Sequence, residues 1–205
     1  MSKTIKLFFG IIILMSIIVS TGCDKDDEDE NDKIPEVVVV NHITYDGTEY
    51  KLTEGTIENY GEMTGVGSYN NDLMLFSGYT VHETDGEIDS LSGTGYLLYM
   101  EMFSTQGEKF DIGDYLYDAD ETYAVKTFDM GTLLVNYNIL NDDGLETEIV
   151  SGKLSILSNG AEYEISFSGT DDKDKAITAY FKGSLKYYDY TSKSVDTKKR
   201  NIFRK

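Results

Sequence analysis

The stretch LSILSNGAEYEISFS at residues 154–168 decides the fold class of this chain. At its centre lies Asn159-Gly160, a dipeptide typical of tight β-turns because both residues tolerate positive φ angles. The apolar residues occupy alternate positions: Leu154 and Ile156 before the turn, then Tyr163, Ile165 and Phe167 after it. Successive side chains of a strand point to opposite faces, so this alternation predicts a β-hairpin with one apolar face.

The same alternation continues in both directions along the chain. Asp46-Gly47 is a second tight-turn signal, with alternating apolar residues on either side. Further runs of one parity are Leu73, Leu75, Tyr79 and Val81; Leu133, Val135, Tyr137 and Ile139; and Ile177, Ala179 and Phe181. Turn signals separate them at Asn70-Asn71-Asp72, Asp85-Gly86, Gly93-Thr94-Gly95, Asp142-Asp143-Gly144 and Asp171-Asp172. Residues 96–103 are apolar on both faces and predict a central strand.

These short runs predict one all-β domain over residues 36–195, with roughly nine to eleven antiparallel strands. The β-branched run from Val37 to Val40 is expected to open it. We expect a β-sandwich or a flattened β-barrel. A calycin-like or lipocalin-like closed barrel is the alternative, although a chain without Trp lacks the Gly-x-Trp signature typical of lipocalins.

Composition excludes several kinds of function. The chain has 205 residues, with 18 Lys and Arg against 37 Asp and Glu, a formal net charge of −19. Such a chain is repelled by phosphate backbones, so we expect no nucleic-acid partner. The single Cys23 permits no internal disulfide, and two distant His residues give no zinc motif. No cofactor is expected.

The N-terminus has the pattern of an export signal. Lys3 and Lys6 precede an uncharged run at residues 7–19. As a helix, this run would span only about 20 Å, short of a hydrocarbon core of about 30 Å. Residues 20–23 (STGC) resemble a bacterial lipobox, although Ser20 stands where an aliphatic residue is usual. The resemblance implies a signal peptide at residues 1–22 and a lipid on Cys23; an ordinary secretory signal is the alternative.

Residues 23–35 form an acidic tether that Pro35 ends. The many like charges and the lack of apolar residues at residues 24–33 predict disorder. Lys25, Asp26 and Asp27 resemble the surface-export signal of Bacteroidetes lipoproteins, which implies an outer-membrane protein facing the cell exterior. An acidic spacer on the periplasmic side is the alternative.

The C-terminal residues 196–205 (DTKKRNIFRK) form a basic tail with five of the 18 basic residues. Its positive charge is suited to a contact with the acidic tether, an acidic partner or lipopolysaccharide phosphates. A solvated chain end or a last strand with charged flanks is the alternative reading.

Two tyrosines are the candidate ligand platform. Sugar faces carry C–H groups that pack on aromatic rings, and Tyr188 and Tyr190 share one face by alternation, whereas Tyr187 falls on the other. We expect Tyr188 and Tyr190 to form an exposed platform; half-buried rings with hydroxyl groups at the rim are the alternative.

The remaining site signals are weaker. Calcium prefers oxygen ligands in short loops, and Asp118, Asp120, Asp171 and Asp174 are the candidates, without EF-hand spacing. Asp89-Ser90-Leu91 matches the O-glycosylation acceptor of exported Bacteroidetes proteins, with Ser90 in a turn-rich stretch. Glu101 lies in an apolar run that could raise its pKa, but a position on the solvent face of a strand is the simpler reading.

No serine-hydrolase elbow or phosphate loop is present in the sequence, so we do not expect an enzyme. The chain resembles the small all-β outer-membrane lipoproteins of Bacteroidetes. The resemblance implies a lipid-anchored, non-catalytic binding module for a glycan or an envelope component. A structural or assembly lipoprotein of the envelope is the main alternative, and a hydrolase is a third.

Overall fold

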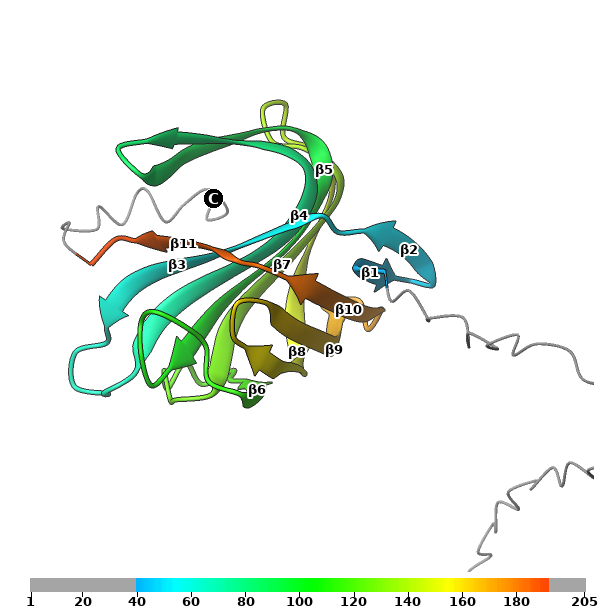
Figure 1. Cartoon of the computed structure of the whole chain (residues 1–205). Coiled ribbons are helices and arrows are strands. Elements are labelled where there is room, and N and C mark those ends of the chain that lie inside the picture. Colours follow the sequence, from blue (N-terminus) through cyan, green and yellow to red (C-terminus); the bar gives the residue numbers. More distant parts are fainter. Residues whose placement is uncertain (1–39, 192–205) are drawn as a thin grey trace, which may run out of the picture. The chain divides into compact units, whose positions relative to one another are not determined.

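The computed structural model describes residues 40–191, which form eleven β-strands and no helix (Figure 1). The strands are β1 (His42–Tyr45), β2 (Thr48–Lys51), β3 (Glu54–Glu62), β4 (Tyr69–Thr84), β5 (Glu87–Ser104), β6 (Gly113–Tyr117), β7 (Thr127–Asn138), β8 (Asp143–Asn159), β9 (Tyr163–Asp171), β10 (Ala176–Gly183) and β11 (Lys186–Asp189). The predicted all-β class is confirmed. In this part of the chain there is no helix with the length and apolar character needed to cross a membrane.

Several predicted features lie outside the described residues. They are the signal peptide at residues 1–22, the tether with Cys23, Lys25, Asp26 and Asp27, and the basic tail at residues 196–205. The run from Val37 to Val40 is described only at Val40, which is 45% exposed and precedes the first strand. The first strand of the described residues is β1.

All eleven strands belong to one sheet that curls into a half-barrel (Figure 1). Their order is β11-β3-β4-β5-β7-β6-β8-β9-β10-β1-β2, and β7 also pairs with β8. β11 runs parallel to β3, and β6 runs parallel to β7, so the sheet is mixed where the sequence predicts antiparallel pairing. The sequence signals of tight turns predict only antiparallel pairs, because a tight turn joins two antiparallel strands.

Two predicted hairpins are confirmed. Asp46 and Gly47 have φ angles of 48° and 79° between β1 and β2, as a type I′ turn requires. β8 pairs with β9, but Asn159 itself lies in β8 opposite Tyr163, so residues 160–162 form the turn instead of the predicted Asn159-Gly160 pair. These turns position the alternating apolar residues of both hairpins.

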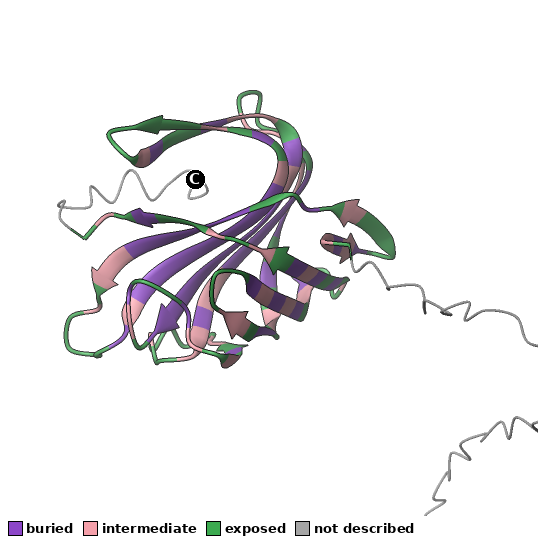
Figure 2. Ribbon diagram, viewed as in Figure 1, coloured by how far each residue is buried: buried purple, intermediate pink, exposed green. Residues whose placement is uncertain are grey.

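The first face of the sheet carries a large apolar core. We define it as the face of β4 and β5 that holds Leu73, Leu75, Leu98 and Met100, all of them fully buried. The curled half of the sheet packs onto it with the predicted alternating residues Ile43, Leu154, Ile156, Ile165, Phe167, Ile177 and Phe181. Buried segments run along the central strands and alternate with exposed ones on the curled half (Figure 2).

A bulge in β4 moves later side chains to the opposite, second face. The pairing of β4 with β5 shifts between Ser77 and Tyr79, and Gly78 lies between them with a φ of 81°. An extra residue in one strand reverses the faces beyond it. Tyr79 and Val81 therefore pack in a second cluster, apart from Leu75, and the predicted common face is wrong beyond Gly78.

β7 changes face in the same way. Val135 pairs with Tyr96 and Tyr137 pairs with Gly95, so Asn136 is the extra residue, with a φ of 50°. Tyr137 consequently packs in the second cluster, whereas Val135 stays in the first core. The predicted single parity of this strand is therefore also wrong.

Glycines let β4 and β5 bend sharply at the bulge. A Cβ on Gly78 would lie 2.6 Å from the carbonyl oxygen of Thr94, and a Cβ on Gly95 would clash with the carbonyl oxygen of Ser77. The bend swings the end of the β4–β5 hairpin, residues 79–92, over the second face (Figure 1). Gly93-Thr94-Gly95 thus forms the bend inside β5 instead of the predicted turn.

Candidate functional site

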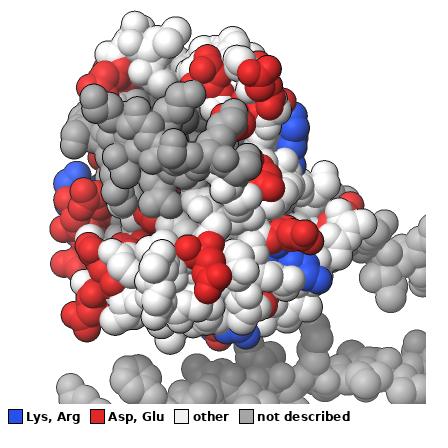
Figure 3. Space-filling model, turned by 90° about the vertical axis from the view of Figure 1, so that its left-hand side faces the viewer, with Lys and Arg blue, Asp and Glu red and all other residues white. Residues whose placement is uncertain are grey.

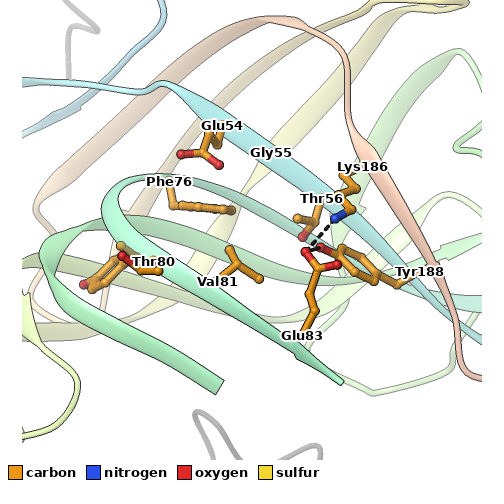
Figure 4. A pocket seen from close by; sticks show the side chains of 10 residues that line it. Glu54, Gly55, Thr56, Phe76, Thr80, Val81, Glu83, Lys186 and Tyr188 are labelled. Carbon is orange, nitrogen blue, oxygen red and sulfur yellow. Dashed lines mark hydrogen bonds and ion pairs between the residues drawn. The ribbon is translucent and has the colours of Figure 1, made fainter. Parts of the chain in front are cut away.

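A cavity lies on the second face, beneath the folded-over hairpin (Figure 4). Its volume is about 370 Å³, within the range of small-molecule sites. Residues of β3, β4 and β11 line it: Glu54, Gly55, Thr56, Phe76, Tyr79, Thr80, Val81, Glu83, Lys186 and Tyr188. The bend at Gly78 creates this cavity, because it brings Val81 and Glu83 over β3 and β11.

The cavity combines aromatic rings with fixed polar groups. The Tyr79 hydroxyl donates a hydrogen bond of 2.9 Å to the carbonyl oxygen of Tyr137. At the other end, Lys186 Nζ lies 2.5 Å from Glu83 Oε1, to which the Tyr188 hydroxyl also donates, at 2.9 Å (Figure 4). Hydrogen bonds from Lys186 and Tyr188 hold the pKa of Glu83 below its usual value.

Thr56 gives the cavity an unsatisfied hydroxyl group. Its side chain lies on β3 and is only 2% exposed. Its Oγ1 makes no hydrogen bond within the described part of the chain. A buried hydroxyl without a partner costs about 1–3 kcal/mol, so Thr56 is a position where a bound ligand could restore a lost hydrogen bond.

Tyr188 and Tyr190 point to the same second face, as the alternation predicts. The predicted exposed platform is wrong at Tyr188, however, because this side chain is only 3% exposed. The parallel pairing of β11 with β3 places Tyr188 beside the cavity under the hairpin. Tyr190 is partly buried, and its ring stacks on Tyr60 at 5.1 Å between centroids.

Three carboxylates lie side by side on the second face. Glu58 on β3 pairs with Asp72 on β4, which pairs with Glu101 on β5. Directly opposite residues of neighbouring strands share a face. The three residues, here named the carboxylate row, are only 5–6% exposed. The expected solvent-facing position of Glu101 is therefore wrong, and the predicted turn at Asp72 lies inside β4.

Tyrosine and asparagine side chains surround the carboxylate row. The Tyr99 hydroxyl donates to Asp72 at 2.8 Å, and Asn70 Nδ2 donates to Glu101. Burial raises the pKa of Glu58 to about 7, although hydrogen bonds from Tyr60 and Tyr190 act against this rise. Within the carboxylate row, Glu58 is therefore a buried carboxyl group with a raised pKa.

No sequence pattern indicated Thr56 and Glu58 as site residues. Glu54, Thr56, Glu58 and Tyr60 alternate as polar positions and look like the solvent face of a strand. Glu54 is exposed, but Thr56 and Glu58 are buried, and Thr56 lines the cavity beneath a hairpin whose bend lies at Gly78.

The predicted calcium ligands Asp118 and Asp120 lie in a loop after β6. Asp118 accepts hydrogen bonds from the backbone N–H groups of Asp120, at 3.2 Å, and Thr122, at 2.9 Å. The Asp118 carboxylate therefore stabilises its own turn.

Asp171 is likewise a structural residue. It is fully buried and accepts hydrogen bonds from the Tyr45 and Thr147 hydroxyls and from the backbone N–H groups of Lys173 and Lys175. Across residues 40–191, no three His, Cys, Asp or Glu side chains are grouped to hold a metal ion, so Asp171 and Asp174 are not joined into a ligand set.

Ser90 is exposed, as a glycosylation acceptor must be. It lies within β5 opposite His82, rather than in the predicted turn, which is confined to Asp85-Gly86. Ser90 is accessible because it lies on the outer side of the bent hairpin.

Acidic side chains dominate the surface near the hairpin and β3 (Figure 3). Residues 40–191 contain 28 Asp and Glu but only eight Lys. Among the lining residues of the cavity the single cation is Lys186, which pairs with Glu83. The site therefore disfavours anionic ligands.

Fold and site together define an all-β half-barrel with a ligand-sized cavity under a bent hairpin. No known protein-family model, curated protein or solved structure matches this chain.

Proposed function

We propose that this protein is a non-catalytic binding module of the bacterial cell envelope that binds a glycan in the cavity beneath the β4–β5 hairpin. The observation that carries the proposal is Thr56, a buried hydroxyl group without a partner in the lining of a cavity of about 370 Å³. A ligand with hydroxyl groups of its own could both donate to Oγ1 and accept from it.

The other lining residues favour a sugar over a purely apolar ligand. Phe76, Tyr79 and Tyr188 offer rings on which the C–H groups of a sugar face can pack. Glu83 and Lys186 offer an acceptor and a donor held in place by their mutual ion pair. Apolar walls with a few fixed polar groups are typical of specific ligand sites.

The envelope location rests on the sequence. The lipobox-like residues 20–23 end at Cys23, and Lys25, Asp26 and Asp27 follow in the acidic tether. In this proposal Cys23 carries the lipid anchor in the outer membrane, and the tether holds the domain on the outer side of the cell.

Glycan binding is tested with the mature chain on an array of bacterial, plant and host glycans. The best array glycan is then titrated by calorimetry. Thr56→Val removes the hydroxyl group at nearly constant shape and should weaken binding about fivefold, because one hydrogen bond is worth about 1 kcal/mol. Thr178→Val, an exposed position on β10, is the matched control and should leave affinity unchanged.

Equal affinity of the Thr56→Val variant and the wild type would remove the cavity from the proposal. A domain that binds no array glycan but forms a defined complex with an envelope protein would instead support the structural or assembly role.

The location is tested by protease treatment of cells. Digestion of the domain on intact cells is the expected result. Protection until the outer membrane is opened would overturn outward display. A Cys23→Ala variant should appear in the soluble fraction if Cys23 carries the anchor.

A further inference from the structure

We infer that the cavity beneath the β4–β5 hairpin selects an amino sugar with a free, protonated amine, and that Glu54 receives this ammonium group. The inference rests on the proposed glycan function and names the class of sugar that the same site takes. It goes beyond a general affinity for glycans, because hydroxyl-bearing, N-acetylated and anionic sugars should all bind less tightly.

The charged side chains in the lining of the cavity leave one carboxylate without a counter-charge. Two carboxylates, Glu54 and Glu83, line the cavity together with one cation, Lys186. Lys186 Nζ is paired with Glu83 Oε1 at 2.5 Å. Glu54 forms no ion pair with any residue in positions 40–191. A free carboxylate beside a neutralised pair attracts a cation and repels an anion.

The hydrogen-bonding groups favour the same kind of ligand, because the free groups of the cavity are mainly acceptors. The hydroxyl groups of Tyr79 and Tyr188 already donate to the carbonyl oxygen of Tyr137 and to Glu83. Glu54 and Oε2 of Glu83 accept no hydrogen bond within the described part of the chain. An ammonium group has three donors and no acceptor, whereas a hydroxyl group has a single donor.

Thr56 is an independent sign of a ligand in this cavity. It is only 2% exposed, and its Oγ1 has no hydrogen-bond partner among residues 40–191. Thr56 follows Glu54 by two positions on β3, so both side chains point to the same face, about 7 Å apart along the strand. One sugar unit with its substituents can bridge this distance. On its other side Thr56 pairs with Lys186 of β11, which places the ion pair next to it.

Phe76 favours a cation at the Glu54 end of the cavity. Glu54 and Phe76 are direct partners across β3 and β4, and directly opposite residues share a face of the sheet. Figure 4 shows the two side chains next to each other, away from Glu83 and Lys186. Aromatic rings attract ammonium ions, so Phe76 and Glu54 act on the same group of the ligand.

Three disaccharides with the same ring skeleton test this selectivity. The β-1,4-linked glucosamine dimer carries free amines, its N-acetylated form carries neutral amides, and cellobiose carries hydroxyl groups at these positions. Each is titrated into the mature chain by calorimetry at about pH 6. The glucosamine dimer should bind about fivefold more tightly than cellobiose, as expected for one partly exposed ion pair. The acetylated dimer should bind no more tightly than cellobiose, and added salt should reduce the preference for the amine.

Glu54→Gln tests the assigned residue, because it removes the charge at nearly constant shape. The preference for the glucosamine dimer over cellobiose should disappear in this variant. Glu162→Gln, an exposed position in the β8–β9 turn outside the cavity lining, is the matched control and should keep the preference. An unchanged preference in Glu54→Gln would overturn the role of Glu54.

The outcomes separate this inference from the proposed function. Equal affinity of the wild type for the glucosamine dimer and cellobiose would overturn the inference and leave glycan binding intact. Spermidine that binds as tightly as the glucosamine dimer would also overturn it, since the cavity would then take an amine without a sugar. A mature chain that binds none of the three disaccharides and no array glycan would defeat the proposed function together with the inference.

Discussion

The two faces of β4 and β5 are built from the same strands but by different chemistry. The first face holds an apolar core that includes Leu98 and Met100. The second face combines apolar residues such as Phe76 with tyrosines and the carboxylate row. Apolar burial stabilises a fold with little dependence on partner geometry, whereas each buried carboxylate needs donors or cations at fixed positions. We therefore expect the first face to carry stability and the second face to carry binding.

The largest expected effect is the loss of an aromatic ring from the first face. Phe128 is fully buried and contacts Tyr117 and Phe167, at 5.5 and 6.1 Å between ring centroids. Phe128→Ala should lower the free energy of unfolding by about 3–5 kcal/mol, since it removes a buried ring and leaves a cavity. Urea denaturation measures the loss.

Leu140→Ala is the control for this prediction, because Leu140 is 74% exposed in the β7–β8 turn. Its effect should stay within about 0.5 kcal/mol. Equal losses for Phe128→Ala and Leu140→Ala would contradict the assignment of stability to the first face.

The second face should make stability depend on pH through Glu58. Its pKa rises from a usual value of 4.5 to about 7 in the folded protein, so between these values the folded state binds more protons than the unfolded state. The free energy of unfolding should therefore fall as pH rises through this window, by about 3 kcal/mol in total. Below pH 4.5 this stabilisation is fully present.

The measurement compares urea denaturation of the wild type and Glu58→Gln at pH 5 and pH 8. The variant should lack most of the wild-type decrease between the two pH values. Glu49→Gln, at an exposed position of β2, should keep it. A decrease of the same size in Glu58→Gln would show that another group causes the pH dependence.

The sequence predicted the first face well, because its information is local. Alternation around Asn159-Gly160 and Asp46-Gly47 placed Ile165, Phe167 and Ile43 in the core, where the structure has them. The central position of residues 96–103 also followed from a run that is apolar on both sides.

The second face could not be predicted in the same way. Two bulges, at Gly78 and Asn136, decide which side chains of β4 and β7 lie on this face. A bulge within a run of alternating residues leaves no local sequence signal stronger than a glycine. Thr56 lines the cavity together with Val81 and Glu83 of a hairpin that follows later in the chain, and strand periodicity does not report such a distant contact. Polar alternation in β3 therefore indicated solvent where the structure has a cavity.

The bend that separates the faces can be tested directly at Gly95. A Cβ at this position would clash with the carbonyl oxygen of Ser77 on β4. Gly95→Ala should therefore destabilise the protein by about 1–3 kcal/mol, in the range of overpacked sites. Gly160→Ala, where a new Cβ meets no atom within 4 Å, is the matched control and should have little effect.

Thermal unfolding of both glycine variants checks this prediction. Similar melting temperatures for Gly95→Ala and Gly160→Ala would mean that β4 and β5 separate easily at the bend. The folded-over hairpin would then be a loosely held cover of the second face rather than a fixed wall of the cavity.

The smallest expected effect is the loss of a single tyrosine hydroxyl, which can be compared between one tyrosine at the rim of each core. Tyr45 donates to the fully buried Asp171 at 2.8 Å, and Tyr188 donates to the exposed Glu83 at 2.9 Å. Tyr45→Phe should cost about 1 kcal/mol at pH 7, because a buried carboxylate loses one of its donors. Tyr188→Phe should cost less, since water can replace the hydroxyl beside Glu83.

Acid distinguishes these two tyrosines further. Burial acts to raise the pKa of Asp171, but hydrogen bonds from Lys175, Tyr45, Lys173 and Thr147 outweigh it and hold the pKa below 3.8. A lowered pKa in the folded protein stabilises the fold at pH values above the usual pKa. This contribution is lost as the pH falls through the pKa of the folded state. The difference between the wild type and Tyr45→Phe in urea denaturation should therefore shrink in acid. A constant difference down to pH 3 would mean that Tyr45 stabilises the first core through its ring, which packs there, and not through the carboxylate.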